Sequence, residues 1–516
     1  MKKLPIGIQS FSELIEGGYL YIDKTAYIYD LISQGKYYFL ARPRRFGKSL
    51  LLSTIKEIFQ GNKKLFDGFA ITEKNYSWEK YPVILFSFAG IPHSTPELLE
   101  QGIVRELGRI AQTYNITINK SLQVGQILQD IVLALAEKNK VVLLIDEYDY
   151  PIVQHAHESE LAKQLREVVK NFYGVIKDLD QSLKFVILTG VSKFAKTSIF
   201  SGLNNLRDLT LSQQAGLILG YTEKEITSNF KDYIVQATDT LQTTERELTS
   251  NLEMWYNGYS FSRDTTERVY NPFSVLNFFA DLDFKNYWFE SGTPTFLINL
   301  IKAKSYPVID FEKLYVAEIE MSILDIESIS LKALLFQTGY LTIKKYDQDA
   351  EVYELSYPNK EVEKSLSSRV FESLTSTSIG SLYRTVSLLY QAFVQQDMKK
   401  VSNLLTGLFA TIPYSIQIPL ERYYQTVFYL IFKVLGANII VEEQTNIGRI
   451  DAVLQTPDSV FIIEFKINAS PADAIKQIEQ KRYFEKYSDA DKQIVLVGIA
   501  FDTNIRNVSG VEAQQL

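Results

Sequence analysis

The sequence has 516 residues, and its 54 Lys and Arg against 61 Asp and Glu give a formal net charge of −7. Hydrophobic residues make up 46% and charged residues 22%, the balance of a folded globular protein, which excludes an intrinsically disordered chain. The length is typical of about three domains. The chain has no cysteine, which excludes disulfides, thiolate metal sites and a cysteine nucleophile, and fits a reducing cytoplasm.

The chain shows no pattern of a membrane or export segment. Its start, Met1–Gly7, has two lysines but no long apolar run behind them. The longest apolar runs, such as Val141–Ile145, are strand-sized and far shorter than the ~20 residues of a membrane-spanning helix. We therefore expect a cytoplasmic protein with no membrane partner. The mild acidity also means that any contact with nucleic acid must depend on a local patch.

The first 220 residues alternate between strand-like and helix-like segments. Four apolar runs predict strands: Tyr37–Leu40, Val83–Phe88, Val141–Ile145 and Phe185–Leu188. Helical periodicity predicts helices at Ser49–Phe59, Pro96–Tyr114 and Leu161–Leu179. Continuous apolar strands separated by helices indicate a parallel sheet that is buried on both faces.

The pattern changes at Thr222, where Thr222–Glu225 has the sequence of a helix capping box. Helical patterns then dominate to about residue 410, interrupted by a predicted hairpin of Tyr340–Ile343 and Val352–Leu355. We therefore expect residues 221–410 to form a mainly helical middle region between domains at 1–220 and 411–516.

The last hundred residues predict a compact α/β unit. Its expected elements, in chain order, are a helix at Glu421–Leu435, strands at Arg449–Leu454 and Val460–Ile467, a helix at Pro471–Tyr487 and a strand at Gln493–Ile499. The first helix places its apolar residues on one face, as a helix packed against a sheet does.

A candidate phosphate-binding loop follows the first predicted strand. Gly47, Lys48 and Ser49 supply what such a loop needs: backbone N–H groups around the β-phosphate, a lysine for the β/γ oxygens and a hydroxyl for Mg²⁺. Arg42 stands where the first glycine of the motif usually lies, which points to a different loop geometry. The alternative is a basic turn before a surface helix.

The third predicted strand, Val141–Ile145, ends in Asp146 and Glu147. Asp146 is expected to bind Mg²⁺ there, and Glu147 to orient or deprotonate the attacking water. A solvated strand end is the alternative, but the two features in this order favour an ATP site. Arg44 and Arg45 either stabilise phosphate charge or form a salt-bridged loop.

A second candidate site lies near the C-terminus. Glu464 and Lys466 are two apart in a predicted strand and so share a face, and Asp451 lies on the neighbouring strand. If they meet, two carboxylates can hold Mg²⁺ beside a lysine, an arrangement suited to phosphodiester hydrolysis. Glu421 is a further candidate ligand, and Gln477 is expected to face the site. The alternative is a surface pair on an edge strand.

The chain resembles a two-part bacterial family in which an AAA-ATPase-like region is joined to a C-terminal PD-(D/E)XK nuclease-type domain. Arg42 agrees with this family, whereas Tyr424-Gln425 stands where the family often has Tyr-His. The segments that carry the resemblance are Pro5–Ile8, Tyr21–Thr25, Arg42–Ser49, Ile145–Asp149, Thr189–Phe194, Phe200–Leu206, Trp255–Tyr259, Tyr270–Ser274, Glu421, Gly448–Asp451, Ile463–Lys466 and Gln477–Ile478.

This resemblance implies a P-loop NTPase sheet, a helical middle region and a restriction-endonuclease-like domain, with ATP and Mg²⁺ as cofactors. We expect an ATP-binding and ATP-hydrolysing protein whose nucleotide state controls a Mg²⁺-dependent nuclease acting on DNA or RNA. A protein partner or a second copy of the chain is compatible with this. The alternative is a non-catalytic ATP-dependent switch or scaffold that binds nucleic acid or a protein, which the acidic net charge favours.

Overall fold

The computed structural model describes residues 1–155, 159–193, 205–290, 297–298, 300–301, 308–322, 330–375, 379–412, 421–445, 448–488 and 492–516. The chain divides into two compact units. The first unit comprises Met1–Phe296 and Lys313–Glu361, and the second comprises Leu297–Glu312 and Val362–Leu516. Helix α17 (Lys360–Leu374) begins in the first unit and continues into the second.

A five-stranded sheet is the framework of the first unit. Its strands are all parallel and lie in the order β2-β3-β4-β1-β5. The four predicted strands and their parallel pairing are confirmed, and the two-residue β5 is too short to give a periodic signal. The strands are β1 (Tyr37–Ala41), β2 (Val83–Ser87), β3 (Val141–Asp146), β4 (Leu183–Gly190) and β5 (Arg207–Asp208).

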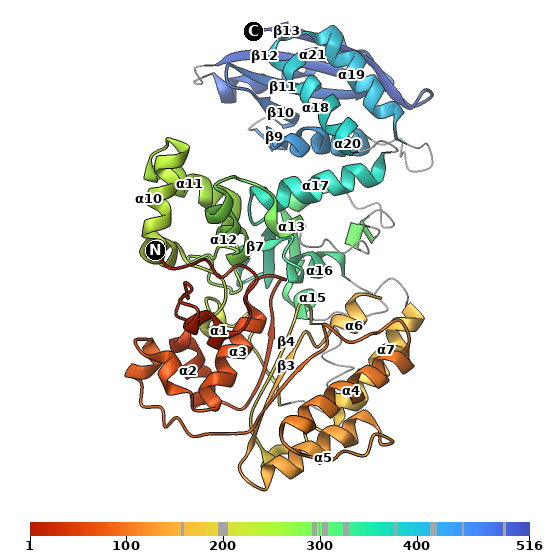
Figure 1. Ribbon diagram of the computed structural model, residues 1–516. Coiled ribbons are helices and arrows are strands. Elements are labelled where there is room, and N and C mark those ends of the chain that lie inside the picture. The colour runs from red at the N-terminus through yellow and green to blue at the C-terminus, as the bar shows by residue number, and fades with distance from the viewer. Residues whose placement is uncertain are drawn as a thin grey trace. The chain divides into compact units, whose positions relative to one another are not determined.

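Helices cover both faces of this sheet, which is why its central strands are apolar throughout (Figure 1). On one side lie α1 (Phe11–Glu16), α2 (Thr25–Gln34) and α3 (Lys48–Phe59), and on the other α4 (Pro96–Thr113), α5 (Val124–Ala136) and α7 (Ser159–Gly174). Helix α7 ends five residues earlier than its apolar pattern predicted. The short α6 (Tyr150–Val153) follows β3.

The middle of the chain is mainly helical, as predicted. Thr222 Oγ1 accepts from the N–H of Glu225, and Glu225 Oε2 accepts from the N–H of Thr222, so the capping box is confirmed. The predicted hairpin is also confirmed, and a third strand joins it in the order β6-β8-β7. The elements are α9 (Glu223–Asn229), α10 (Lys231–Leu241), α11 (Glu245–Tyr256), α12 (Pro272–Asp281), α13 (Tyr287–Glu290), β6 (Leu314–Ala317), α15 (Glu318–Ser322), α16 (Leu331–Gln337), β7 (Thr342–Asp347) and β8 (Val352–Ser356).

The second unit has a mixed five-stranded sheet in the order β13-β12-β11-β10-β9. Only β11 and β12 pair in parallel. The predicted strands are confirmed, and β9 and β13 extend the sheet at its two edges. The elements are α18 (Ile379–Val394), α19 (Met398–Ala410), α20 (Glu421–Leu435), β9 (Asn438–Gln444), β10 (Arg449–Gln455), β11 (Ser459–Ile467), α21 (Pro471–Gln480), β12 (Gln493–Asp502) and β13 (Asn507–Gln515).

The single helix predicted at Pro471–Tyr487 was wrong in its second half. Helix α21 ends at Gln480, and a separate 3₁₀ turn forms at Tyr483–Tyr487. Arg482 separates them because its φ of 46° lies in the left-handed region, which a continuing helix cannot accommodate. The break changes the direction of every side chain that follows it.

Helices α20 and α21 cover opposite faces of this sheet. Phe428 of α20 packs on Phe465 of β11, with ring centroids 5.1 Å apart. Ile478 of α21 belongs to the apolar cluster that contains Ile462. Because Phe465 and Ile462 are an odd number of residues apart on one strand, they point to opposite faces.

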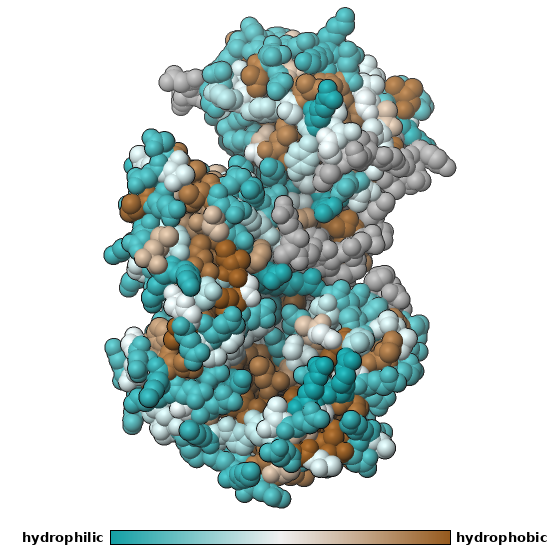
Figure 2. All heavy atoms as spheres, in the orientation of Figure 1, coloured by the Kyte–Doolittle hydropathy of each residue, from teal (hydrophilic) through white to brown (hydrophobic). Residues whose placement is uncertain are grey.

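The surface is mixed in character. Figure 2 shows mostly hydrophilic residues, with apolar residues gathered in separate patches. Ile319 on α15 and Val235 on α10 are among the most exposed large apolar side chains, at 69% and 60%. Within the described ranges, no helix combines the length and the apolar character that crossing a membrane requires.

Candidate nucleotide and phosphodiester sites

The loop between β1 and α3 presents Lys48 at the first position of the helix. Gly47 caps α3 with a φ of +95°, a conformation that favours glycine because a Cβ is strained there. Lys48 is buried, and its Nζ donates to the carbonyl oxygens of Arg42 and Pro43, both at 2.9 Å. Burial lowers the pKa of Lys48, while the carboxylate of Glu147 opposes that shift. The Lys48 ammonium is therefore bound by carbonyl oxygens of the candidate phosphate-binding loop itself.

Ser49 and Asp146, the predicted Mg²⁺ ligands of this site, are in direct contact. Ser49 Oγ donates to Asp146 Oδ2 at 2.5 Å. Thr189 Oγ1 donates to Asp146 Oδ1 at 2.6 Å. Strand β4 lies between β1 and β3, so Thr189 at its carboxyl end comes between the two motifs. A hydroxyl and a carboxylate are thereby brought together at the carboxyl edge of the sheet, where ligands of such folds bind.

Glu147 lies beside this pair and lines the same cavity as Lys48. Its backbone φ is 50°, in the left-handed region, which costs a non-glycine residue on the order of 1 kcal/mol or more. Burial is the main cause that raises the pKa of Glu147, and Lys48 opposes it. A strained, half-buried carboxylate with a raised pKa has the properties of a general base.

The turn after β4 is held by hydrogen bonds and an ion pair to neighbouring segments. Asp149 is buried and accepts from the N–H of Ser192 at 2.7 Å and from its Oγ at 2.6 Å. Lys193 pairs with Asp208, with Nζ and Oδ2 3.0 Å apart. The N–H of Lys193 donates to Oε1 of Gln337 at the end of α16, at 2.7 Å. Ser192 and Lys193 thus tie the turn after β4 to its neighbours.

Arg42 does not act as a phosphate ligand in place of the missing glycine. Its side chain is 1% exposed and turned into the protein, where it donates to the carbonyl oxygens of Ala41, Thr210 and Ala215 at 2.8–2.9 Å. Its guanidinium also lies 4.4 Å from the ring centroid of Phe261. Burial lowers the pKa of Arg42 to about 9. The residue anchors the base of the loop.

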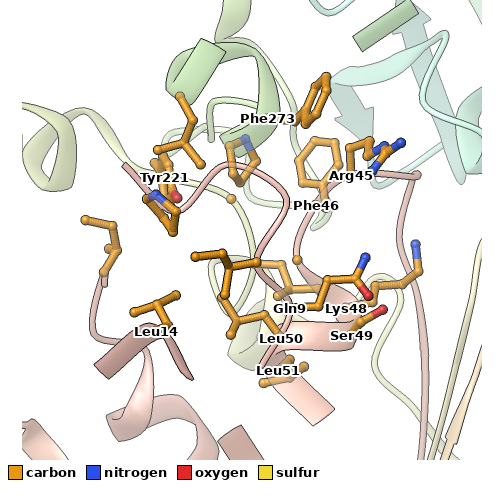
Figure 3. A pocket seen from close by; sticks show the side chains of 18 of the residues that line it. Gln9, Leu14, Arg45, Phe46, Lys48, Ser49, Leu50, Leu51, Tyr221 and Phe273 are labelled. Atoms are coloured by element: carbon orange, nitrogen blue, oxygen red, sulfur yellow. The ribbon is translucent and has the colours of Figure 1, made fainter. Parts of the chain in front are cut away.

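A cavity of about 430 Å³ opens beside the loop (Figure 3), a size common for small-molecule sites. Figure 3 shows Arg45, Phe46 and Phe273 at the top of the view and Leu14, Leu50 and Leu51 at the bottom. Arg44 also lines it, so both loop arginines predicted from the sequence reach the cavity. The remaining walls come from Pro5–Gln9, Leu20–Ile22, Lys24, Ile218–Tyr221, Leu276 and Asn277, none of which was predicted as a site residue.

In the second unit, Asp451 and Glu464 lie across from each other on neighbouring strands. The antiparallel pairing of β10 with β11 ends at Ala452 opposite Ile463, and Asp451 and Glu464 are the next residues along the two strands beyond that pair. Asp451 reaches β11 directly, because its Oδ2 accepts from the backbone N–H of Phe465, the residue after Glu464, at 2.8 Å. Both side chains are buried, at 6% and 3% exposure. Two buried carboxylates are costly unless hydrogen bonds or a cation stabilise them.

Lys466 and Gln477 lie on the same face as Glu464. Lys466 Nζ is 3.7 Å from Glu464 Oε1 and donates to Gln477 Oε1 at 2.6 Å. Gln477 Nε2 donates to Glu464 Oε1. One amide of α21 therefore bridges the lysine and the carboxylate, and fixes the position of each relative to the other.

Two residues of this site were not predicted from the sequence. Gln425 of α20 donates from Nε2 to Asp451 Oδ1 at 2.9 Å. Tyr483 is buried, and the desolvation and the nearby charge of Glu464 both raise its pKa. A continuous helix would have turned Tyr483 away from Gln477, so only the break after α21 places it here. The signal for Gln425 was a buried polar position within an apolar helix face.

The donor groups at both sites fit Mg²⁺, which is bound through one or two carboxylates together with substrate phosphates and several waters. Ser49 with Asp146, and Asp451 with Glu464, are hard oxygen donors of that kind. Among the residues that the structure describes, no group of three or more His, Asp or Glu side chains is arranged to hold a metal. The side chain of Glu421 lies outside the described part of the chain, as do Phe194 and residues 200–204.

The fold and the sites define a P-loop ATPase-like region joined to a nuclease-type domain. A family model described as "Predicted AAA-ATPase" matches residues 5–200, and one described as "PD-(D/E)XK nuclease superfamily" matches residues 420–510. The chain belongs to the family that joins these two domains. It is 36% identical over 542 residues to the "Uncharacterized protein in vnfD 5'region" of Azotobacter chroococcum mcd 1, with 100% of this chain and 99% of that protein covered. No solved structure matches the chain.

Proposed function

We propose that this protein binds and hydrolyses ATP and that its nucleotide state controls a Mg²⁺-dependent nuclease that cleaves DNA or RNA. The contact of Ser49 with Asp146, next to Lys48 and an open cavity, carries the first part of the proposal. Arginines and a lysine gather on the loop side of the cavity and apolar residues on its other walls, which suits a triphosphate and a base respectively. The lack of cysteine fits a site of action in the cytoplasm.

Each residue of the nucleotide site has a proposed task. Lys48 exchanges the carbonyl oxygens of Arg42 and Pro43 for the β- and γ-phosphate oxygens. Negatively charged oxygens stabilise a buried ammonium more strongly than neutral carbonyl oxygens do. Glu147 takes a proton from the attacking water, aided by its raised pKa. Arg44 and Arg45 stabilise charge on the phosphates.

In the second unit, the carboxylates of Asp451 and Glu464 would hold the metal, and Lys466 would orient the nucleophile. Bound Mg²⁺ would neutralise phosphate charge at the first site, and at the second would polarise the phosphodiester and acidify a water. Gln477 keeps the Lys466 ammonium beside Glu464 without neutralising either charge. Glu421 at the start of α20 is proposed as a further ligand.

Control by ATP is supported by hydrogen bonds that begin at the phosphate loop. Trp288 Nε1 donates to the carbonyl of Arg44 at 3.0 Å, and the backbone N–H of Trp288 donates to Glu361 Oε1 at 2.6 Å. Gly339 also approaches the loop closely, since a Cβ built there would lie 2.7 Å from Pro43 Cβ. A shift of the loop on nucleotide binding would therefore displace Trp288 and Gly339 of the middle region, which contact it.

Glu361 lies on the same helix as residues of the second unit. It lies in the first turn of α17, whose later residues belong to the second unit. There Glu363 of α17 accepts from Lys433 Nζ of α20 at 2.6 Å. Helix α20 also carries Gln425, which contacts Asp451. We propose that α17 and α20 transmit the state of the phosphate loop to the nuclease carboxylates, a role that needs two arrangements of these elements.

A cleavage assay on DNA and RNA with Mg²⁺ or Mn²⁺, with and without ATP, tests the function. We expect the wild type to cleave in an ATP-dependent manner, Glu464→Ala to be inactive, and Lys48→Ala to lose the response to ATP. Glu512→Ala removes the same charge from an exposed position of β13 and should cleave like the wild type. Equal cleavage by wild type and Glu464→Ala would contradict the assignment of the site. A wild type that binds ATP but cleaves neither substrate would favour the non-catalytic switch.

A further inference from the structure

Gln425 is an unusual residue for its position. It lies in the middle of α20, a helix whose described side chains are almost all buried, and is itself 3% exposed. A primary amide in such a position costs free energy unless it is hydrogen-bonded. Its Nε2 donates to Asp451 Oδ1 at 2.9 Å, so the amide is directed at a candidate metal ligand of the nuclease site.

Asp451 is held at both of its oxygens by donors from different elements. Oδ1 accepts from Gln425 of α20, and Oδ2 accepts from the backbone N–H of Phe465 on β11 at 2.8 Å. Two donors on the two oxygens fix the plane of the carboxylate as well as its position. The backbone donor is set by the pairing of β10 with β11, whereas the amide is a side chain that a substitution removes without changing the sheet.

The other carboxylate of the site is held in the same way. Gln477 of α21 donates from Nε2 to Glu464 Oε1 and accepts from Lys466 with its own Oε1. Because an ionised carboxylate only accepts, each glutamine must turn its NH₂ group toward the acid. Helices α20 and α21 thus each supply one neutral amide to one carboxylate.

We propose that Gln425 is a positioning residue that orients Asp451 for a divalent cation. The amide supports the carboxylate without neutralising it, so the full negative charge of Asp451 stays available to the metal. This inference rests on the proposed function, because it takes Asp451 as a metal ligand. Partners of metal ligands typically change metal affinity by 10–100-fold when they are removed.

Calorimetric titration of the nucleotide-free full-length protein with Mn²⁺ tests the proposal. The binding that disappears in Asp451→Asn defines the Asp451-dependent site. Gln425→Met keeps the length of the side chain and removes the donor, and we expect it to weaken that binding by about tenfold. Gln425→His restores an N–H donor at pH 8, and we expect it to recover most of the affinity. Gln480→Met, an exposed glutamine of α21, is the matched control and should bind like the wild type.

The outcomes separate this inference from the proposed function. If wild type and Asp451→Asn bind Mn²⁺ equally, Asp451 is not a metal ligand and the proposed site fails. If Asp451→Asn loses binding while Gln425→Met binds like the wild type, the role of Gln425 is wrong. Thermal melting establishes that each variant is folded at the temperature of titration. Should Gln425→Met melt below it, Gln425→Asn, whose amide is one methylene shorter, takes its place and must show the same loss.

Discussion

The two candidate sites hold their acidic residues in different ways. In the nucleotide site, Asp146 is bonded by Ser49 at the start of α3 and by Thr189 near the end of β4, hydroxyl residues at the carboxyl edge of the parallel sheet. In the nuclease site, Asp451 and Glu464 are bonded by amides that come from helices. The first site therefore depends on segments that end or directly follow strands of one sheet, whereas the second depends on how the middle parts of two helices pack on theirs.

This difference follows from the two sheets. A parallel sheet brings the carboxyl ends of its strands to one edge, so motifs that directly follow strands meet there. In the mixed sheet, Asp451 and Glu464 lie on two antiparallel strands, just beyond the pair of Ala452 with Ile463, so their approach depends on how those strands pair. A shift of one residue in that register would turn one of the two side chains to the other face. Substitutions should therefore act locally in the first site and through packing in the second.

The largest expected effect is that of Glu147→Gln on ATP hydrolysis. Loss of a general base lowers turnover by about 10²–10⁴-fold, while ATP still binds because Lys48 and Ser49 are unchanged. When the pH is lowered, hydrolysis by the wild type should decline at a higher pH than it would with an exposed glutamate as the base. The reason is that burial raises the pKa of Glu147. Steady-state turnover and nucleotide binding as functions of pH measure this.

The same pKa shift predicts a change in stability with a definite sign. Since the pKa of Glu147 is raised in the folded state, its contribution to stability is fully present below the unfolded pKa and is lost as pH rises through the folded pKa. Glu147→Gln cannot ionise, so its melting temperature should rise relative to the wild type as pH increases through that range. A fall at neutral pH would mean that the ionised form is stabilised in the fold.

Arg42→Gly makes the loop resemble the usual phosphate-loop motif, yet we expect it to destabilise the protein. It leaves the carbonyls of Thr210 and Ala215 without the guanidinium, and each unsatisfied buried acceptor costs about 1–3 kcal/mol. The free energy of unfolding should fall by about 3 kcal/mol in denaturant titrations. Arg45→Gly is the control, because its φ of 65° suits glycine and its change should be near zero. Equal losses in both variants would contradict an anchoring role.

The outline of the fold was predictable because its signals are local. The apolar runs that became β1 to β4, the capping box at Thr222 and the helix Glu421–Leu435 each depend on neighbouring residues only. The break after Gln480 was not predictable, since the amphipathic pattern continues past it and tertiary packing selects the left-handed Arg482. Helix α5 and strands β9 and β13 were likewise not identified.

The sites followed the same rule. The proximity of Ser49 to Asp146, beside Lys48, could be predicted because each motif is contiguous in sequence and a parallel sheet brings the carboxyl ends of its strands to one edge. Gln425 was identified only as a departure from the resembling family, since its contact with Asp451 spans 26 residues and depends on how α20 packs. The anchoring role of Arg42 was not predicted, because the sequence alone did not indicate that its side chain turns inward.

Glu361→Gln tests whether the two sites communicate. The amide retains one acceptor oxygen, so it cannot accept from both Trp288 N–H and Ser274 Oγ as the carboxylate does. We expect the stimulation of cleavage by ATP to fall by about fivefold or more, within the usual range of coupling energies, while ATP turnover and ATP-free cleavage stay unchanged. Glu372→Gln, on the same helix, should keep full stimulation. Unaltered stimulation in Glu361→Gln would exclude this route.

The smallest expected effects concern surface charge near the nuclease site. Several cations there are paired with acids: Arg449 with Glu442 at 3.3 Å, Lys476 with Asp473 at 3.9 Å, and Arg482 with Glu485. Exposed pairs of this kind are worth about 0–1 kcal/mol, so Lys476→Ala should weaken nucleic-acid binding less than about fivefold.

Binding to DNA or RNA by the inactive Glu464→Ala variant, measured over a range of salt concentrations, gives the number of phosphates neutralised. We expect log K against log [salt] to have a slope no steeper than about −3, because each neutralised phosphate of duplex DNA contributes about −0.9. A slope near −8 would mean that about nine phosphates are neutralised. That result would indicate that most of the nucleic-acid contacts lie outside the surroundings of Glu464, and that the second unit contributes cleavage but not most of the binding.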